Sequence, residues 1–465
     1  MSFGHSSRAG CRHWHPRTRY LPMLLAAWLG STTALAVTPS PSGAPDALAV
    51  ANPATPVSPM DPLTWPSTPV DTGPAPAVNR AQALAAWQRA NARVAEFPRG
   101  HADLLKWEAA TPSAPQTTAP SAATTFTLAE ALQRSLRLRP DLLASPDLAP
   151  AERVRLQSRW ADHVRQVQTA WLAAVTAHER HRIAAEVLEN ARLGAELGRR
   201  MVQAGNWSQA RQLREQMIET RARQGWMATA LERRVSLEQL ARLTGVWDNT
   251  EANGLTGRLP PQLPAAPAQV PQAPDAQAQA LARWPGLDTL RAKLDSALPL
   301  PGMDAWDDAT DRAARDLRGE DTTVMGDAPA IHDRRLFNNH RIPHTAELRG
   351  ELLREATVRR SQVREAEAAL QAHHALARLA QDELVASQRL IEQETLLRYN
   401  GMLMSTWDLL AAARDRLAAL DEATQARHRY WQAEAAWRSL LAGGHYPGAQ
   451  AAGDGGASGN APEGH

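Results

Sequence analysis

The feature that most constrains this chain is a stripe of small and aliphatic residues in its C-terminal half. Between positions 352 and 391, twelve positions follow one another at alternating spacings of four and three, and nine of them hold Leu, Ala, Val or Ile. A helix keeps such a stripe covered only by supercoiling around a partner helix. The same spacing continues further along the chain at Ala419, Ala423, Ala426, Tyr430, Ala433, Trp437 and Leu440. The pattern predicts an all-α fold of long antiparallel coiled-coil hairpins.

Two short breaks divide the helical patterns, at Gly205-Asn206 and at Asn400-Gly401. From each of these glycines to the glycine that ends the following helical run, the distance is 40 residues in the first half and 42 in the second. Self-similarity of this kind indicates an internal duplication. Glycine supplies the backbone freedom that a tight reversal requires. The sequence therefore predicts two helical hairpins, each of which reverses at its break.

The predicted helices are too long to lie inside a compact core. A helix over residues 346–398 would span about 80 Å at about 1.5 Å per residue. Alanine dominates the stripes, and small side chains let helix axes approach closely. Two hairpins of this length cannot cover all of their own apolar faces. We therefore expect copies of the chain to associate.

The first 36 residues have the pattern of a secretory signal peptide: four arginines, the apolar run LPMLLAAWLG and a terminal Ala-Leu-Ala. Without these arginines, 47 basic residues face 49 acidic ones, so the mature chain is nearly neutral and nothing predicts nucleic-acid binding. The single cysteine, Cys11, lies within the segment that would be removed. The mature chain is thus expected to be exported and to contain no disulfide.

Composition suggests further boundaries along the chain. The expected parts are a signal peptide (1–36), a disordered Pro/Ala-rich tether (37–78), a short helical segment (79–110), a linker (111–125), the first hairpin repeat (126–247), a Pro/Ala/Gln linker (248–279), the second hairpin repeat (280–444) with an irregular insert (299–345), and a disordered tail (445–465). Thr127 is the expected N-cap at the start of the first repeat, with Glu130 completing a capping-box pattern.

Two stretches resemble a known family. RYNGMLMSTWDLLAAARDRL, followed by YWQAEAAWRSLLAGG, is similar to the second helical hairpin of TolC-type outer-membrane efflux factors, and AELGRRMVQAGNWSQARQLREQMIETRARQ resembles the first. The resemblance covers roughly residues 126–444. It implies a homotrimer whose helical tunnel crosses the periplasm and exports small molecules or metal ions together with a periplasmic adaptor protein and an inner-membrane pump.

The resemblance also implies roles for the residues at the two breaks. They would form the periplasmic tips, where the adaptor docks and the pore narrows, and the residues concerned are Gly205, Asn206, Trp207, Tyr399, Asn400, Gly401 and Asp408. In the family, a Tyr and an Asp near the second tip belong to a polar network that closes the entrance, and Tyr399 and Asp408 match them by spacing. The position of the family's Arg falls on Met404. A packed aromatic residue and a solvated helix acid are the simpler interpretation of the same two side chains.

The family pattern is not matched between the helices. Only about 15 residues, LLASPDLAPAERVRL, lie where the first two membrane strands belong, and the second such segment is charged and lacks alternation. The sequence therefore predicts little or no β-barrel. Two localisations stay open, the outer membrane facing the periplasm or the soluble periplasm. The alternative function is a soluble periplasmic coiled-coil scaffold or metal-handling protein without transport.

The chain shows no motif for enzymatic chemistry. It contains no nucleophile elbow, phosphate-binding loop or HExxH sequence, and no cofactor is expected. His332, His340 and His344 cluster in the insert and are weak candidates for a metal site, because imidazole suits Zn and Cu. Loop histidines this close together in sequence are more often solvated, so we predict no metal site.

Overall fold

The computed structural model describes residues 85, 88, 89, 125–264, 276–317, 319–320, 323–324 and 328–448. The expected signal peptide and tether lie outside the described residues, as do nearly all of 79–110 and 111–125 and the tail beyond 448.

The first half of the described chain consists of one short helix, one long hairpin and a second short helix. The elements are α4 (Leu128–Arg137), the 3-10 turn η1 (Pro140–Leu142), α5 (Pro150–Gln203), α6 (Gln209–Thr244) and α7 (Asn249–Arg258). Thr127 caps α4 as expected, because its hydroxyl accepts from the Glu130 amide. The Glu130 carboxylate instead binds Arg258 at the end of α7.

The second half repeats the long hairpin after a longer introduction. Its elements are α8 (Ala276–Ala282), α9 (Pro285–Ala297), α10 (Met303–Arg315), β1 (Gly319–Glu320), β2 (Thr323–Val324), α11 (Arg335–Asn338), α12 (Arg341–Arg378), the π-helix η2 (Leu379–Val385), α13 (Ala386–Asn400) and α14 (Thr406–Leu441). β1 and β2 pair antiparallel, with Gly319 opposite Val324. The prediction of an all-α fold built on two long helical hairpins is confirmed.

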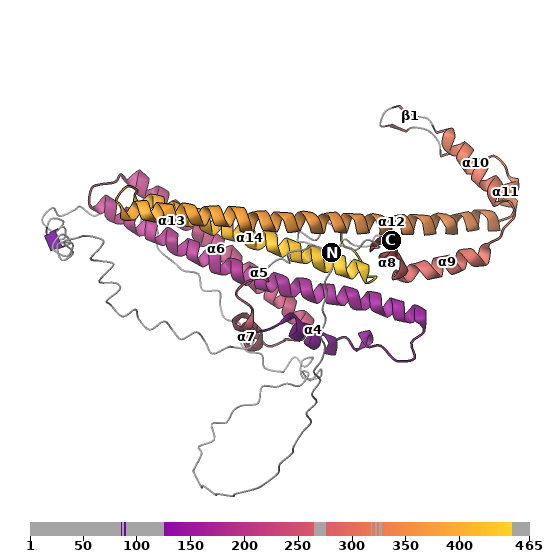
Figure 1. Cartoon of the computed structure of the whole chain (residues 1–465), viewed down its shortest axis with the longest axis horizontal. Helices are drawn as coiled ribbons and strands as arrows, with labels where there is room; N and C mark the ends of the chain where they lie inside the picture. The colour runs from indigo at the N-terminus through magenta and orange to yellow at the C-terminus, as the bar shows by residue number, and fades with distance from the viewer. Residues whose placement is uncertain are drawn as a thin grey trace, which may run out of the picture. The chain divides into compact units, whose positions relative to one another are not determined.

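The long helices lie side by side in the order α6, α5, α14 and the α12–η2–α13 rod (Figure 1). α5 and α14 therefore occupy the inner positions, and α6 and the rod form the two edges. The predicted stripe on α14 is buried at Ala419, Ala423, Tyr430 and Trp437.

One buried carboxylate connects the inner helices α5 and α14 to each other and to the segment that follows α7. Glu179 of α5, 4% exposed, accepts from Arg427 of α14 at 3.0 Å and from the Leu263 amide at 3.3 Å.

The rod confirms the predicted stripe as far as η2, in which Ala380 is buried and Leu384 is half-buried. Val363, Ala366, Leu370 and Ala377 are buried against α14 as predicted. A π-helix holds one extra residue per turn, so the side chains beyond it are rotated relative to an α-helix. Ile391, predicted to lie on the covered side, is 50% exposed, while Val385 and Thr395 are buried in its place. The prediction for the last part of the stripe is therefore wrong.

Three segments expected to be irregular are structured. Residues 249–258 of the expected linker form α7, whose Ala252 and Leu255 join the core of the first hairpin. The insert contains α10, whose Met303 packs with Leu300 and Ile342. In the expected tail, Tyr446 is 5% exposed and packs on the second hairpin. In each case tertiary packing of a few apolar residues overrides a composition that is poor in them.

Among the described residues, no helix has both the length and the apolar character of a membrane span.

Candidate functional site: the paired hairpin tips

The first tip is a five-residue reversal between α5 and α6. Gly205 has a φ of +77°, in the left-handed region that glycine adopts at little cost. The Gly205 amide donates to the Val202 carbonyl at 2.9 Å, and the Asn206 amide donates to the Met201 carbonyl at 2.9 Å. The Ser208 hydroxyl then caps α6. The backbone therefore reverses where the sequence predicts it.

The second tip follows the same hydrogen-bond scheme with different residues. The Met402 amide donates to the Tyr399 carbonyl at 2.9 Å, and the Leu403 amide donates to the Arg398 carbonyl at 2.8 Å. Met402, and not Gly401, adopts the left-handed conformation, with a φ of 61°. Gly401 itself has a φ of −82°. The reversal lies at the predicted break, but the prediction that Gly401 supplies its backbone freedom is wrong.

Two tryptophans join the tips. The rings of Trp207, from the first tip, and Trp407, from the first turn of α14, lie with their centroids 4.3 Å apart and an interplanar angle of 36°. Aromatic pairs at this separation add about 0.5–1.5 kcal/mol beyond the area that they bury. Both reversals therefore lie at the same end of the four long helices and form one surface.

A pair of glycines on α5 makes room for these rings. Gly194 and Gly198 are buried and lie one helical turn apart. A Cβ atom at Gly198 would lie 3.5 Å from the Trp207 ring, and one at Gly194 would lie 3.7 Å from the Trp407 ring. The absent side chains form a shallow notch, and we call the two glycines and two tryptophans the Trp–Gly cluster. The guanidinium of Arg211 covers the Trp207 ring from above, 3.9 Å from its centroid.

Tyr399 and Asp408 have separate surroundings in this chain. Asp408 forms a capping box with Ser405, whose hydroxyl and amide both donate to Asp408 Oδ2, at 2.7 and 2.9 Å. These two hydrogen bonds from Ser405 lower the pKa of the Asp408 carboxyl. Tyr399 is half-buried at the end of α13. The geometry thus gives Asp408 a role in starting α14.

Among the large apolar side chains of the described residues, the two most exposed are at the second tip. Met402 is 86% exposed and Leu403 is 79% exposed. Neither residue is among those predicted from the sequence to form the site, although two consecutive apolar residues in a predicted turn are a readable signal. A non-glycine residue held in the left-handed region is strained by about 1–2 kcal/mol, and such strain concentrates at functional sites.

The weak metal candidates lie far along the chain from the tips and are open to solvent. His332, His340 and His344 are all exposed, and His340 immediately precedes α12. Among the residues that the structure describes, no group of three or more His, Cys, Asp or Glu side chains has an arrangement that could hold a metal ion.

No protein-family model and no curated protein matches this chain. Among solved structures, the outer-membrane channel OprN has a TM-score of 0.46 at 18% identity, with 68% of this chain and 72% of that one covered. The Campylobacter jejuni CmeC outer membrane channel has a TM-score of 0.46 at 14% identity, with 67% and 68% covered. The outer membrane protein VceC from Vibrio cholerae has a TM-score of 0.43 at 12% identity, with 68% and 74% covered.

All three TM-scores are below 0.5. The solved structures to which this chain is similar are TolC-family outer-membrane channels, the family that its sequence resembles.

Proposed function

We propose that copies of this chain assemble side by side, as a homotrimer, into a tube of helices that serves as the periplasmic part of an efflux channel. The chain itself has no enzymatic role. The channel exports small molecules or metal ions together with a periplasmic adaptor and an inner-membrane pump. The observation that carries this proposal is the pair of uncovered edges of the four-helix layer.

The first edge is the outer side of α6. Within the chain, the long helix that packs against α6 is α5. Large apolar side chains remain at least 43% exposed on the outer side, at Leu213, Met217, Leu231 and Val235. Apolar residues that recur at helical spacing on an exposed helix face mark a surface that a partner covers. We call this set the α6 edge.

The second edge is the outer side of the α12–η2–α13 rod. Its exposed apolar side chains are Leu353, Val358, Leu376, Leu379, Leu390, Ile391 and Leu397, each at least 49% exposed. Before η2 the heptad stripe of this rod faces α14, and apart from Ile391 the exposed residues lie outside that stripe and form a second face. We call this set the rod edge.

The two edges match in height above the tips. Met217 lies eleven residues after Asn206, and Leu390 lies eleven residues before Gly401. In the same way, Leu231 and Leu376 each lie 25 residues from their tip. The Trp207–Trp407 contact holds the two tips at the same height. The α6 edge of one copy can therefore cover the rod edge of the next. A contact between two different surfaces of neighbouring copies is heterologous, and it forms a closed ring when the rotation between copies closes.

The tips supply the surface for a partner protein. Met402 and Leu403 project from the second tip, and the Trp–Gly cluster holds both tips rigidly behind them. Rigid support beneath exposed apolar residues favours a binding surface, because little conformational freedom is lost on docking. An adaptor with an apolar helical end fits this surface. The proposed contact set keeps Gly205, Asn206, Tyr399, Asn400 and Gly401 as neighbours of these two side chains.

Oligomeric state tests the proposal first. The mature chain should sediment as a trimer. Leu231→Arg or Leu376→Arg should shift it toward monomer, because either change places an unpaired charge in an apolar contact. Leu317→Arg is the matched control, since Leu317 is 48% exposed but lies on neither edge. A wild-type chain that is monomeric at micromolar concentration would contradict the proposal.

A cellular assay tests the tips. A host strain that lacks the gene should be sensitive to one or more of a panel of dyes, detergents and metal salts, and the wild-type chain should restore resistance. Met402→Ser combined with Leu403→Ser should assemble normally but fail to restore resistance. The change Leu317→Ser should restore it fully. Equal resistance with the double tip variant would remove the tips from the proposed docking surface.

A further inference from the structure

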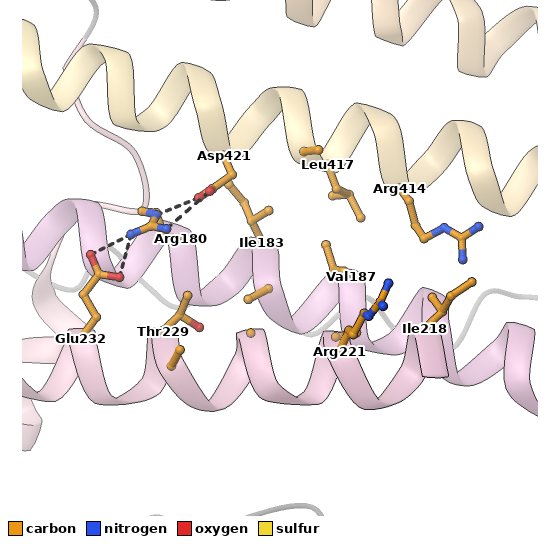
Figure 2. Close-up of a pocket in the computed structure, with 15 residues that line it drawn as sticks. Arg180, Ile183, Val187, Ile218, Arg221, Thr229, Glu232, Arg414, Leu417 and Asp421 are labelled. Atoms are coloured by element: carbon orange, nitrogen blue, oxygen red, sulfur yellow. Dashed lines mark hydrogen bonds and ion pairs between the residues drawn. The ribbon is translucent and has the colours of Figure 1, made fainter. Parts of the chain in front are cut away.

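A groove lies closer to the tips than to the far end of the long helices, lined by residues of α5, α6 and α14. It runs over α5 between α6 and α14, and its volume is about 640 Å³ (Figure 2). Small-molecule sites in proteins are typically about 300–1,000 Å³ and mainly apolar, with a few polar groups that fix orientation. The groove has this size and, as its two ends and floor show, this composition.

The end of the groove away from the tips is closed by one arginine and two carboxylates. Arg180 of α5 donates through Nε to Asp421 of α14 at 2.8 Å, and through Nη1 to both oxygens of Glu232 of α6, at 2.8 and 2.6 Å. The dashed lines in Figure 2 show this bridge across three helices. With two carboxylates, Arg180 is fully compensated. It fixes the width of the groove and is not free to bind a further anion.

The floor and most of the walls of the groove are apolar. Ile183 of α5 and Leu417 of α14 are each 3% exposed and lie beneath it. The walls also hold the small or aliphatic residues Ala184, Val187, Ile218, Ala222, Gly225, Ala228 and Ala418, and one polar residue, Thr229, whose hydroxyl donates to the Trp226 carbonyl at 3.0 Å. A Cβ atom at Gly225 would meet nothing within 4 Å, so the space above this glycine is open.

The end of the groove nearer the tips carries two arginines without a carboxylate. Arg221 of α6 and Arg414 of α14 both line this end, with their guanidinium groups in the space between α14 and the α5–α6 pair (Figure 2). Neither has a hydrogen bond or ion pair with any other residue in 125–264, 276–317 or 328–448. Two like charges at one site repel each other, and an anion between them removes that repulsion and can accept charge-assisted hydrogen bonds from both.

The length of the groove suits an apolar chain. Arg414 and Asp421 are seven residues apart on α14, which corresponds to about 10 Å at about 1.5 Å per residue. A ligand whose anionic group meets Arg221 and Arg414 would therefore extend its apolar body along Ile183 and Leu417 toward the Arg180 bridge.

We propose that this groove binds a single-chain amphiphilic anion, with its carboxylate or sulfate between Arg221 and Arg414 and its alkyl chain on the apolar floor. The site is complete within one copy of the chain. The proposal is therefore independent of ring assembly and of transport.

Titration calorimetry on the purified mature chain tests the site, with sodium dodecanoate below its micelle concentration as the probe. Dodecanoate should bind with one site per chain. Dodecanol and dodecyltrimethylammonium, which share the alkyl chain, should bind at least about tenfold more weakly, a difference of about 1.4 kcal/mol. Replacing Arg221→Gln and Arg414→Gln together should weaken dodecanoate binding at least tenfold and remove the preference for the anion.

A filling variant tests the apolar floor without loss of stability. Gly225→Leu places a side chain in the open space and replaces a mid-helix glycine, so the helix should not be weakened. It should abolish dodecanoate binding. Gly350→Leu is the matched control, because Gly350 lies inside α12, also has nothing within 4 Å of a Cβ atom, and is outside the groove. Arg364→Gln controls for the lost charge.

The possible results are distinct. Loss of binding in both groove variants, with wild-type binding in both controls, supports the site. Equal binding of dodecanoate and dodecanol, or wild-type affinity in Gly225→Leu, would overturn it. No detectable dodecanoate binding to the wild-type chain would overturn it as well, and it would leave the proposed channel unaffected.

Discussion

The two tips make the same turn with different side chains, and the difference shows which parts of a reversal are replaceable. In both, the second and third amides beyond the preceding helix donate to its carbonyls, and a serine caps the start of the next helix. The left-handed position holds Gly205 in the first tip and Met402 in the second. Backbone hydrogen bonds and the serine cap therefore suffice to define the turn. The strained residue can then be chosen for its exposed side chain.

The third helical position after each serine also differs between the tips. In the first tip it is Arg211, whose guanidinium lies over Trp207. In the second it is Asp408, which closes a capping box on Ser405. The start of α6 at the first tip is thus stabilised by a contact with an aromatic ring, and the start of α14 at the second tip by hydrogen bonds to a carboxylate.

Removing either tryptophan should have the largest effect. Trp207→Ala and Trp407→Ala should each destabilise the chain by about 2–3 kcal/mol, below the range for fully buried Trp because both rings are half-buried. Trp207→Ala should cost slightly more, since it also removes the Arg211 contact. Urea unfolding followed by circular dichroism measures both. Trp247→Ala, at a residue 38% exposed, is the control and should cost less than either.

The stability of variants at Gly198 should depend on the size of the new side chain. Gly198→Leu should destabilise by about 2 kcal/mol, because the added side chain must displace the Trp207 ring. Gly198→Ala should be neutral or mildly stabilising, since its Cβ meets only ordinary contacts at 3.5 Å and beyond. Thermal unfolding compares them. Equal melting temperatures for the two variants would show that the ring does not rest on the notch.

Exchanging the left-handed residues should move stability in opposite directions. Met402→Gly should stabilise by about 1 kcal/mol, and Gly205→Met should destabilise by about 1–2 kcal/mol, because only glycine adopts this conformation without strain. If Gly205→Met leaves the midpoint of chemical unfolding unchanged, the first tip has another conformation in solution. Gly401→Ala is the control and should change little, because its φ is −82°.

The smallest expected effect is on the stability of the chain at acidic pH. The Asp408 carboxyl has a lowered pKa, so its contribution is present above the ordinary Asp value and is lost as the pH falls through the lowered value. Asp408→Asn should therefore lose less stability than the wild type between pH 5 and about pH 2. Asp316→Asn, at an exposed helix end, should retain the wild-type loss. An unchanged acid profile in Asp408→Asn would contradict the capping box.

Periodicity in the sequence predicted the long helices and the place of both reversals, because each depends on local pattern and turn residues. It could not reveal η2. The heptad pattern in the sequence continues through this segment, but the wider π-helical turn rotates the following side chains away from the predicted face. The contact of Trp207 with Trp407 joins positions 200 residues apart in sequence and depends on tertiary packing. α7 was missed for the same reason, because its two glycines oppose a helix that Ala252 and Leu255 hold in place.

We claim that the α6 edge of one copy covers the rod edge of the next, and disulfide trapping is the sharpest test of this contact. The chain has one cysteine, Cys11, in the expected signal peptide, so introduced cysteines in the mature chain have no competitor. Leu231→Cys combined with Leu376→Cys should give covalent dimers and trimers on a non-reducing gel and nothing larger. Leu231→Cys combined with Leu353→Cys, at unequal heights, should give little product. Crosslinks only within single chains, or a ladder extending beyond trimers, would contradict the claim.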